Sequence, residues 1–215
     1  MKVTIIDYGL SNLLSVQHAF AHFGAETLLT SKPEDVLAAD ALVLPGVGAF
    51  QDGMAGLEKL GLVEPIRQKA AAGTPLLGIC LGMQMLFDES EEFGLHKGLG
   101  LIPGRVVKIP DTDVDGHPQK VPHISWDPLY PGGGRTDFSG TALAALKPGE
   151  ECYFIHSYEA KPTDETDCLA FTVYGGRRIC AAATHGSVLG CQFHPEKSGE
   201  VGLKIIEEFM KSADR

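Results

Sequence analysis

Pro75-Leu-Leu-Gly-Ile-Cys-Leu-Gly-Met-Gln84 is the stretch that decides the fold of this 215-residue chain. Its apolar run predicts a buried strand that ends at Cys80, and residues 81–87 read as the start of a helix. A residue between the end of a strand and the first turn of a helix is lifted out of the sheet, as in a nucleophile elbow. Gly78 and Gly82 remove side chains that would crowd such a sharp turn.

Cys80 is therefore a candidate nucleophile. A helix N-terminus favours the thiolate, which is the form of cysteine that attacks. The alternative is that Cys80 is a small buried hydrophobic residue, which is the usual state of a lone cytosolic cysteine. The presence of histidines elsewhere in the chain favours the nucleophile.

Strand and helix patterns alternate in the first half of the chain. Strands are expected at 3–6, 27–29, 41–44 and 76–79, and helices at 11–23 with Ser11 as N-cap, at 33–39, and at 57–72, which Pro65 can break. Such alternation predicts parallel strands joined by right-handed crossovers.

The second half reads as strands separated by turns and loops. Strands are expected at 104–109, 121–125, 152–158, 168–173, 179–184 and 188–193, with turns at Gly175-Gly176 and His185-Gly186, loops at 111–118 and 131–140, and a last helix from near Ser198. We therefore expect an α/β fold in one domain, residues 1–215. Its open mixed, mainly parallel central sheet would be flanked by helices, with additional antiparallel strands in the second half.

Composition excludes several classes of protein. The chain is 44% hydrophobic and 21% charged, which is ordinary for a globular domain, and its formal net charge of -10 argues against nucleic-acid binding. The five cysteines include no closely spaced CxxC pair, which disfavours a disulfide framework or a structural metal site. We find no signal peptide and no apolar run near the ~20 residues of a membrane span, so a cytoplasmic protein is expected.

His194 is the histidine best placed to act as a base. It follows an apolar strand, Pro195 fixes the backbone after it, and Glu196 stands two residues on. In an extended stretch residues i and i+2 project to the same side, so the carboxylate would reach the imidazole and hold its tautomer. The alternative is a surface histidine beside a solvated glutamate.

Leu44-Pro-Gly-Val-Gly-Ala-Phe50 lies at the end of the third expected strand. It can be an ordinary glycine-rich turn. Its glycines can also let backbone N–H groups approach a ligand closely, and ligands bind at the carboxyl ends of strands in open parallel sheets.

With these segments the chain resembles the triad, class I glutamine amidotransferases, and more closely the glutaminase subunits of imidazole glycerol phosphate synthase. The segments that carry the resemblance are 78–84, 192–198, 6–12, 45–50, 121–126 and 153–158. One departure is that the family usually has Gly and then Trp-Asn where this chain has Ser125, Trp126 and Asp127. That segment faces the synthase partner in the family.

The resemblance implies a mechanism and a site. Cys80 would attack the side-chain amide of glutamine, His194 would protonate the leaving ammonia and then activate water, and Glu196 would orient His194. The resemblance also implies that backbone N–H groups of Leu81 and, after a loop rearrangement, of Val47-Gly48 would bind the oxyanion. Glutamine would be bound by Gly48, Gln84, Ser157 and Tyr158. No metal or organic cofactor is implied.

The resemblance also implies a partner. In the family, ammonia passes to a (β/α)8-barrel cyclase subunit, in a heterodimer that makes imidazole glycerol phosphate and aminoimidazole carboxamide ribotide for histidine biosynthesis. The chain itself has no phosphate-cradling Gly-Lys loop. Trp126 and Tyr153 are candidate contacts, since such residues are enriched at interface hot spots, or they are core aromatics. Two other functions stay open: a paralogous amidotransferase that feeds a different synthase, and a binding module without chemistry.

Overall fold

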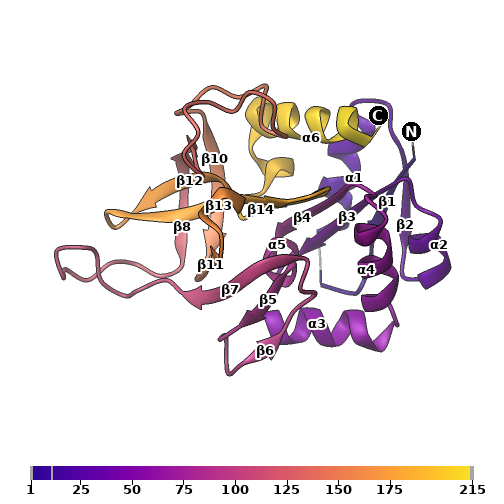
Figure 1. Cartoon of the computed structure of the whole chain (residues 1–215), viewed down its shortest axis with the longest axis horizontal. Coiled ribbons are helices and arrows are strands. Elements are labelled where there is room, and N and C mark those ends of the chain that lie inside the picture. Colours follow the sequence, from indigo (N-terminus) through magenta and orange to yellow (C-terminus); the bar gives the residue numbers. More distant parts are fainter. Residues whose placement is uncertain (1, 11, 214–215) are drawn as a thin grey trace.

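An eight-stranded sheet forms the centre of the protein in the computed structural model, which describes residues 2–10 and 12–213 (Figure 1). In spatial order its strands are β2 (Glu26–Thr30), β1 (Lys2–Ile6), β3 (Ala41–Gly46), β4 (Leu76–Cys80), β14 (Val188–Cys191), β13 (Arg177–His185), β12 (Cys168–Tyr174) and β9 (Tyr130–Pro131). The first five run parallel and the rest pair antiparallel, which confirms the expected mixed α/β sheet.

Helices cover both faces of this sheet (Figure 1). One face carries α1 (Leu13–Ala21) and α6 (Gly199–Ala213), and the other carries α2 (Pro33–Leu37), α3 (Phe50–Lys59), α4 (Val63–Ala71) and α5 (Leu81–Met85). Alternate strand residues enter the two cores: Val43 packs on the α1/α6 side, and Leu42 and Leu44 pack on the α3 side. Because both of their faces are buried, the central strands β3 and β4 are apolar throughout, as parallel strands usually are.

The second half adds two smaller sheets. One pairs β8 (His123–Pro128) with β10 (Glu151–His156), and the other has the order β11 (Tyr158–Pro162), β7 (Ile102–Lys108), β5 (Phe87–Ser90) and β6 (His96–Lys97). Gly175-Gly176 forms the β12–β13 hairpin turn, and the β13–β14 turn contains Gly186, as the sequence predicts.

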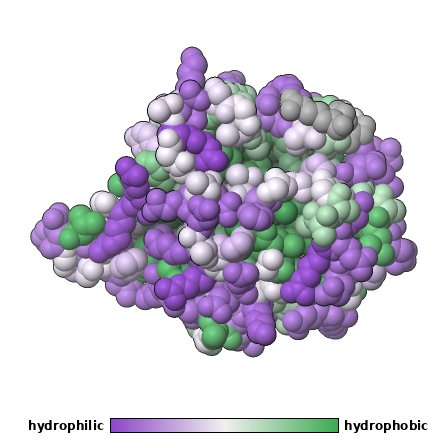
Figure 2. Space-filling model, in the orientation of Figure 1, coloured by the Kyte–Doolittle hydropathy of each residue, from purple (hydrophilic) through white to green (hydrophobic). Residues whose placement is uncertain are grey.

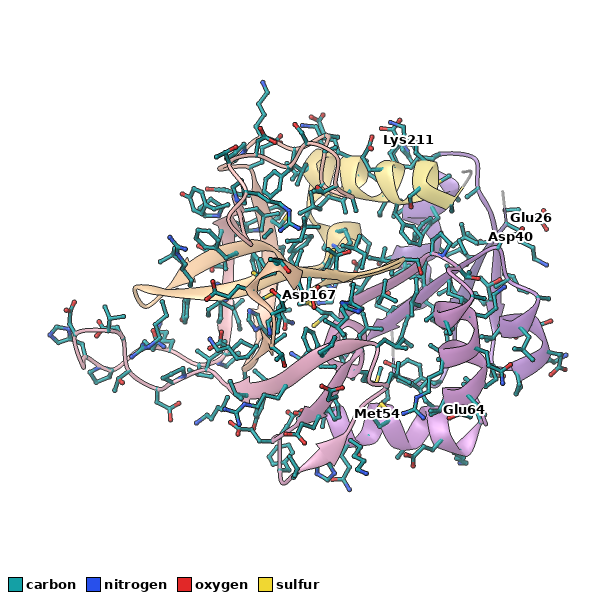
Figure 3. All side chains as sticks on the ribbon, in the orientation of Figure 1. Glu26, Asp40, Met54, Glu64, Asp167 and Lys211 are labelled. Carbon is teal, nitrogen blue, oxygen red and sulfur yellow. The ribbon has the colours of Figure 1, made fainter. Side chains whose placement is uncertain are left out.

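The polar surface surrounds these layers. Figure 2 shows hydrophilic side chains over most of one face, including the extension formed by the β7–β8 connection. Among the residues labelled in Figure 3, Glu26, Asp40 and Lys211 are exposed at the periphery, whereas Met54 is buried in the α3 core. In the ranges that the structure describes, no helix combines the length and apolar composition that crossing a membrane requires.

Two expected helices are wrong in their bounds. The helix expected at 57–72 is two helices, and the break falls at Gly61, which has a φ of +67°, rather than at Pro65. Pro65 lies in the first turn of α4, where a missing N–H costs little. The helix expected from 81 ends at Met85, and Phe87 already begins β5. Ser11, the expected N-cap, lies outside the described residues, and Asn12 precedes α1.

Three expected strands also differ in their bounds. The strand expected at 121–125 starts only at His123, after Pro122, which cannot donate a hydrogen bond to a neighbouring strand. The strand expected at 152–158 is two strands in different sheets, separated at Ser157. The strand expected at 188–193 ends at Cys191, because the chain turns towards the 3₁₀ segment Pro195–Lys197.

Candidate active site

Cys80 occupies the junction between β4 and α5 with φ 54° and ψ −110°. A positive φ is uncommon for a residue other than glycine, and such strain gathers at functional sites. The turn is tight because the neighbouring glycines let α5 approach the sheet. A Cβ on Gly82 would lie 1.7 Å from the carbonyl oxygen of Leu44, and one on Gly78 would lie 2.8 Å from Leu86 Cδ1. The structure thus forms the elbow that the sequence predicts.

His194 and Glu196 form a buried pair beside this elbow. Nδ1 of His194 lies 2.8 Å from Oε1 of Glu196, and both side chains are 2% exposed. Because β14 runs parallel to β4, His194 and Cys80 emerge at the same edge of the sheet. The contact is made by a 3₁₀ turn over Pro195–Lys197, so the expectation that an extended stretch would bring Glu196 to His194 is wrong.

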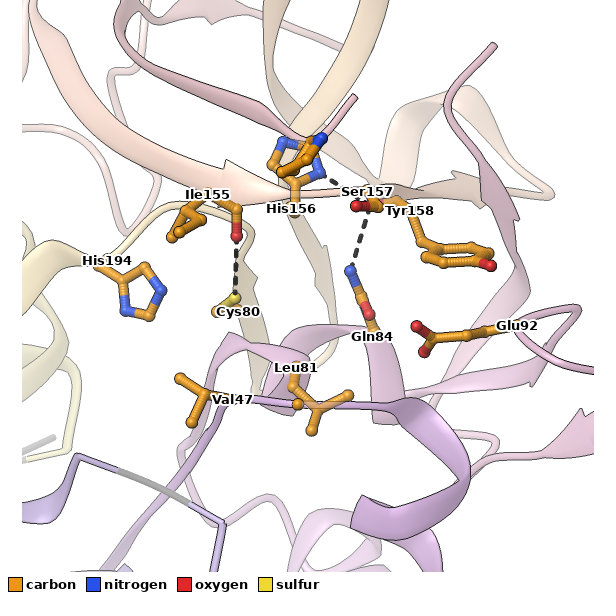
Figure 4. A pocket seen from close by; sticks show the side chains of 12 residues that line it. Val47, Cys80, Leu81, Gln84, Glu92, Ile155, His156, Ser157, Tyr158 and His194 are labelled. Carbon is orange, nitrogen blue, oxygen red and sulfur yellow. Dashed lines mark hydrogen bonds between the residues drawn. The ribbon is translucent and has the colours of Figure 1, made fainter. Parts of the chain in front are cut away.

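The second ring nitrogen of His194 faces the sulfur. In Figure 4 Nε2 points toward Cys80, and this buried atom has no hydrogen-bond partner among the residues that the structure describes. Burial by itself lowers the pKa of His194, but the nearby Cys80 sulfur and the Glu196 carboxylate raise it to about 9. The imidazole is therefore held by the carboxylate on one side and is available to the sulfur on the other.

A cavity of ≈ 300 Å³ opens in front of these groups (Figure 4). Eight of the nine residues expected at the site line it, namely Val47, Gly48, Cys80, Leu81, Gln84, Ser157, Tyr158 and His194, while Glu196 lies behind His194. Gln84 is fixed by two bonds from its Nε2, to the carbonyl oxygen of Tyr158 at 3.1 Å and to Oε1 of Gln192 at 3.0 Å.

Four lining residues were not among the nine predicted site residues, namely Glu92, Pro122, Ile155 and His156, although His156 is an alternative candidate for the base. Glu92 follows β5, a short strand that was itself missed, and its Oε2 accepts the backbone N–H of Phe50 at 2.7 Å. The carbonyl oxygen of Ile155 lies 3.9 Å from the Cys80 sulfur. Ile155 and His156 could have been predicted as lining residues, because they directly precede Ser157 in the segment 153–158 that carries the family resemblance.

The glycine-rich loop after β3 borders the cavity, and one of its backbone N–H groups is already hydrogen-bonded within the protein. The backbone N–H of Val47 donates to the carbonyl oxygen of Leu10 at 2.9 Å, so it is not free for a ligand. The N–H of Leu81, at the first position of α5, has no partner within its helix and is the available donor at the elbow. Gly48 has a φ of +106°, which a side chain would disfavour.

These features define the class of the protein. The chain matches the family "Glutamine amidotransferase class-I" over residues 4–213. It belongs to that family, whose chemistry the Cys80, His194 and Glu196 arrangement suits.

Close relatives narrow the class further. The chain is 51% identical over 210 residues to imidazole glycerol phosphate synthase subunit HisH 1 of Legionella pneumophila (strain Lens), covering 98% of this chain and 99% of that protein. It is 43% identical over 210 residues to the HisH subunit of Lactococcus lactis subsp. lactis (strain IL1403), covering 98% of each. Within the class, the chain belongs to the HisH family.

Solved structures agree on the fold. A "glutamine amidotransferase" crystal structure superposes with a TM-score of 0.73 at 19% identity, covering 99% of both chains. The structure of PurLQS from Thermotoga maritima gives a TM-score of 0.68 at 20% identity, with 98% of each chain covered. At this level of identity the likeness concerns the fold alone.

Proposed function

We propose that this protein hydrolyses glutamine to glutamate and ammonia with Cys80, His194 and Glu196, and delivers the ammonia to a synthase partner. By analogy with its HisH relatives, the partner is the (β/α)8-barrel cyclase subunit of imidazole glycerol phosphate synthase, in a cytoplasmic heterodimer that serves histidine biosynthesis. The observation that carries the proposal is the strained elbow cysteine, which faces the free Nε2 of a histidine held by a buried glutamate.

The chemistry follows from these positions. The Cys80 thiolate attacks the amide carbon of glutamine, and the carbonyl oxygen becomes an oxyanion. The protonated Nε2 of His194 gives its proton to the amide nitrogen, and the C–N bond breaks. Ammonia is released, and a glutamyl thioester remains on Cys80. The neutral imidazole then takes a proton from water, the resulting hydroxide attacks the thioester, and glutamate departs as the thiolate re-forms. Glu196 stabilises the imidazolium in both steps.

The oxyanion needs donors that the cavity supplies only in part. Leu81 N–H is placed at the elbow, whereas Val47 N–H is bonded to Leu10. We propose that docking of the partner shifts the Val47-Gly48 loop so that Val47 N–H turns to the oxyanion and glutamine is held by Gly48, Gln84, Ser157 and Tyr158. Such a shift would couple glutamine hydrolysis to the presence of an acceptor for ammonia.

The face that we propose for docking is formed by β8 and β10. Its apolar side chains Ile124, Trp126 and Ile155 are 53%, 51% and 40% exposed. Trp126 is thus not a core residue, and its ring packs 5.9 Å from that of the half-buried Tyr153. Ile155 also lines the cavity, so this face reaches the proposed site of ammonia release.

Co-purification with a barrel cyclase subunit and a glutaminase assay test the proposal. We expect the isolated chain to hydrolyse glutamine slowly, and the complex to be stimulated at least ~100-fold when the acceptor nucleotide is present, the scale of one lost oxyanion donor. Cys80→Ala is the matched control, which should fold and bind the barrel subunit but show no hydrolysis. Full activity of the isolated chain would contradict the gating, and activity of Cys80→Ala would contradict the nucleophile.

Two further measurements separate the other functions. Restoration of histidine-independent growth, in cells that lack their own glutaminase subunit, would exclude an amidotransferase dedicated to another synthase. Covalent labelling of Cys80 by an electrophilic glutamine analogue would exclude a binding module without chemistry.

A further inference from the structure

A buried polar network lies behind the cavity, on β8 and β10. His123 is fully buried, and its Nδ1 lies 3.0 Å from Nε2 of His156. On its other side, Nε2 of His123 is within hydrogen-bonding distance of Oδ2 of Asp127 and, at 3.0 Å, of the Ser125 hydroxyl. The His123 ring is held between Phe154 and Tyr174, at centroid distances of 5.1 and 4.1 Å. The Asp127 end is 22% exposed and flanks Trp126.

The network continues from His156 to the glutamine side of the cavity. Nδ1 of His156 donates to the carbonyl oxygen of Tyr158 at 2.8 Å, the same oxygen that accepts from Gln84. Gln84 bonds to Gln192, whose Nε2 lies 3.9 Å from the Cys80 sulfur. A continuous chain of polar contacts therefore runs from Asp127, which lies on the side of the β8–β10 sheet opposite Trp126, to the proposed nucleophile.

The number of protons in the two-imidazole segment is fixed by its ends. Both ends are acceptors, the Tyr158 carbonyl and the Asp127 carboxylate, and three contacts join them through the two rings. Each contact needs one proton, but two neutral imidazoles supply only two. The Ser125 hydroxyl can donate to Asp127, but it cannot fill the direct contact between His123 and Asp127. All three contacts are satisfied only if the segment holds one additional proton.

We propose that Asp127 and His123 are positioning residues, which share this additional proton and through His156 hold the Tyr158 carbonyl that shapes the glutamine-binding side of the cavity. The inference rests on the proposed function for its kinetic consequence, but not for the proton itself. A buried hydrogen-bonded network of this kind fixes a unique arrangement only while every member is satisfied.

Of the two rings, His123 is the better site for the additional proton, because only there does the Asp127 carboxylate lie in direct contact. Burial lowers the pKa of His123 and lowers that of His156 to about 3, while the Asp127 carboxylate opposes the shift at His123. The titratable groups that face the two rings from other elements are Tyr174 of β12, stacked on His123, and His194 after β14, whose charge disfavours a proton on His156. The shared proton thus resides between His123 Nε2 and the carboxylate, and it leaves as the pH rises.

Replacement of Asp127 by asparagine tests the proton count. The amide of Asp127→Asn can donate to His123 Nε2, so that all three contacts are satisfied by neutral rings. In nitrogen-15 NMR of histidine-labelled protein, we expect the wild type to show a strongly downfield proton coupled to His123 Nε2, and Asp127→Asn to lack it. Glu151→Gln, an exposed change on β10 opposite Pro128, should leave the signal in place. An unprotonated, acceptor-type shift for His123 Nε2 in the wild type, with no downfield proton, would overturn the proposal whether or not the protein is a glutaminase.

Kinetics of the complex with its barrel subunit test the positioning role. We expect Asp127→Ala to raise the KM for glutamine about tenfold, the lower end of the effect of removing a partner that orients a functional group, with kcat changed less. Asp127→Asn should restore the KM, and it should lack the rise in KM that we expect in the wild type when the shared proton is lost as the pH rises. The role would be contradicted if Asp127→Ala and Asp127→Asn changed kcat and KM to the same extent, or if the pH profile of KM in Asp127→Asn matched that of the wild type. The control Glu151→Gln should match the wild type in both kinetic constants.

Discussion

At the scale of single residues, the proposed site depends on three side chains from two distant parts of the chain, which meet at one edge of the sheet. Cys80, His194 and Glu196 stood out because each follows an apolar strand or a fixed backbone, and their side chains come together in the structure. The exposure of Trp126 and the burial of His123 could not be predicted, because a strand in a two-stranded sheet gives no sign of which face is covered. The polar network of His123 depends on those two facts.

The free energy of unfolding should depend on pH through the protonation of His194. Its folded-state pKa of about 9 lies above the ordinary value of 6.5, so the protonated ring stabilises the fold. That contribution is fully present below about pH 6.5 and is lost as the pH rises through about 9. Urea unfolding should show a fall in the free energy of unfolding, on the order of 3 kcal/mol, between these values.

The variant His194→Gln is the control for this measurement. It keeps the size and polarity of the side chain but cannot titrate, so its free energy of unfolding should stay level over the same pH range. A parallel fall in wild type and variant would assign the pH dependence to other groups. In the glutaminase assay the same variant should lose at least ~100-fold in rate.

At the scale of helices and strands, predictions failed where tertiary contacts override local preference. The helix α3 contains Gly53 and Gly56, which lower its intrinsic propensity, and only its last three residues, 57–59, were expected. The glycines are needed for close packing, since a Cβ on Gly53 would lie 2.6 Å from Met85 Sδ and one on Gly56 3.0 Å from the carbonyl oxygen of Tyr8. The parallel strands were predicted well, because burial on both faces makes them continuously apolar.

The elbow should be sensitive to a single methyl group. Gly82→Ala would place a Cβ against the carbonyl oxygen of Leu44, a rigid backbone atom of β3, so α5 must move away from the sheet. We expect a loss of about 3 kcal/mol in the free energy of unfolding, at the upper end for overpacking, and loss of activity through displacement of Cys80. Ala55→Ser, an exposed change in α3, should cost less than about 1 kcal/mol. Normal activity in Gly82→Ala would show that the elbow tolerates such a shift.

At the scale of the whole molecule, the loop expected at 111–118 projects from the body and is held by residues far along the chain. The 111–118 extension is tied to the β12–β13 hairpin, since Val114 N–H donates to the carbonyl oxygen of Gly175 at 3.0 Å and Arg177 donates to that of Asp113 at 2.9 Å. It lies at the far end of the molecule from α2 (Figure 1). The sequence predicted a loop here but not these contacts, which join residues more than sixty positions apart.

Removal of the Arg177 side chain should free this extension without affecting the proposed site. We expect Arg177→Ala to be cut faster by limited proteolysis within 111–118, by about tenfold if the local opening free energy falls by ~1.4 kcal/mol. Its glutaminase rate and melting temperature should change little. Arg178→Ala, whose guanidinium packs on Phe171 instead, is the matched control and should be cut at the wild-type rate. Equal protection in the two variants would show that Arg177 does not hold the extension.

The position of β14 has a consequence for how the chain is made. This strand is synthesised late yet inserts between β4 and β13, so the nascent chain leaves the apolar edge of β4 uncovered until residues 188–191 leave the ribosome. Uncovered strand edges invite association with other chains. The same order of synthesis keeps the thiol of Cys80 without the imidazole of His194 until β14 follows, so that the proposed reactivity and the completed sheet arise together.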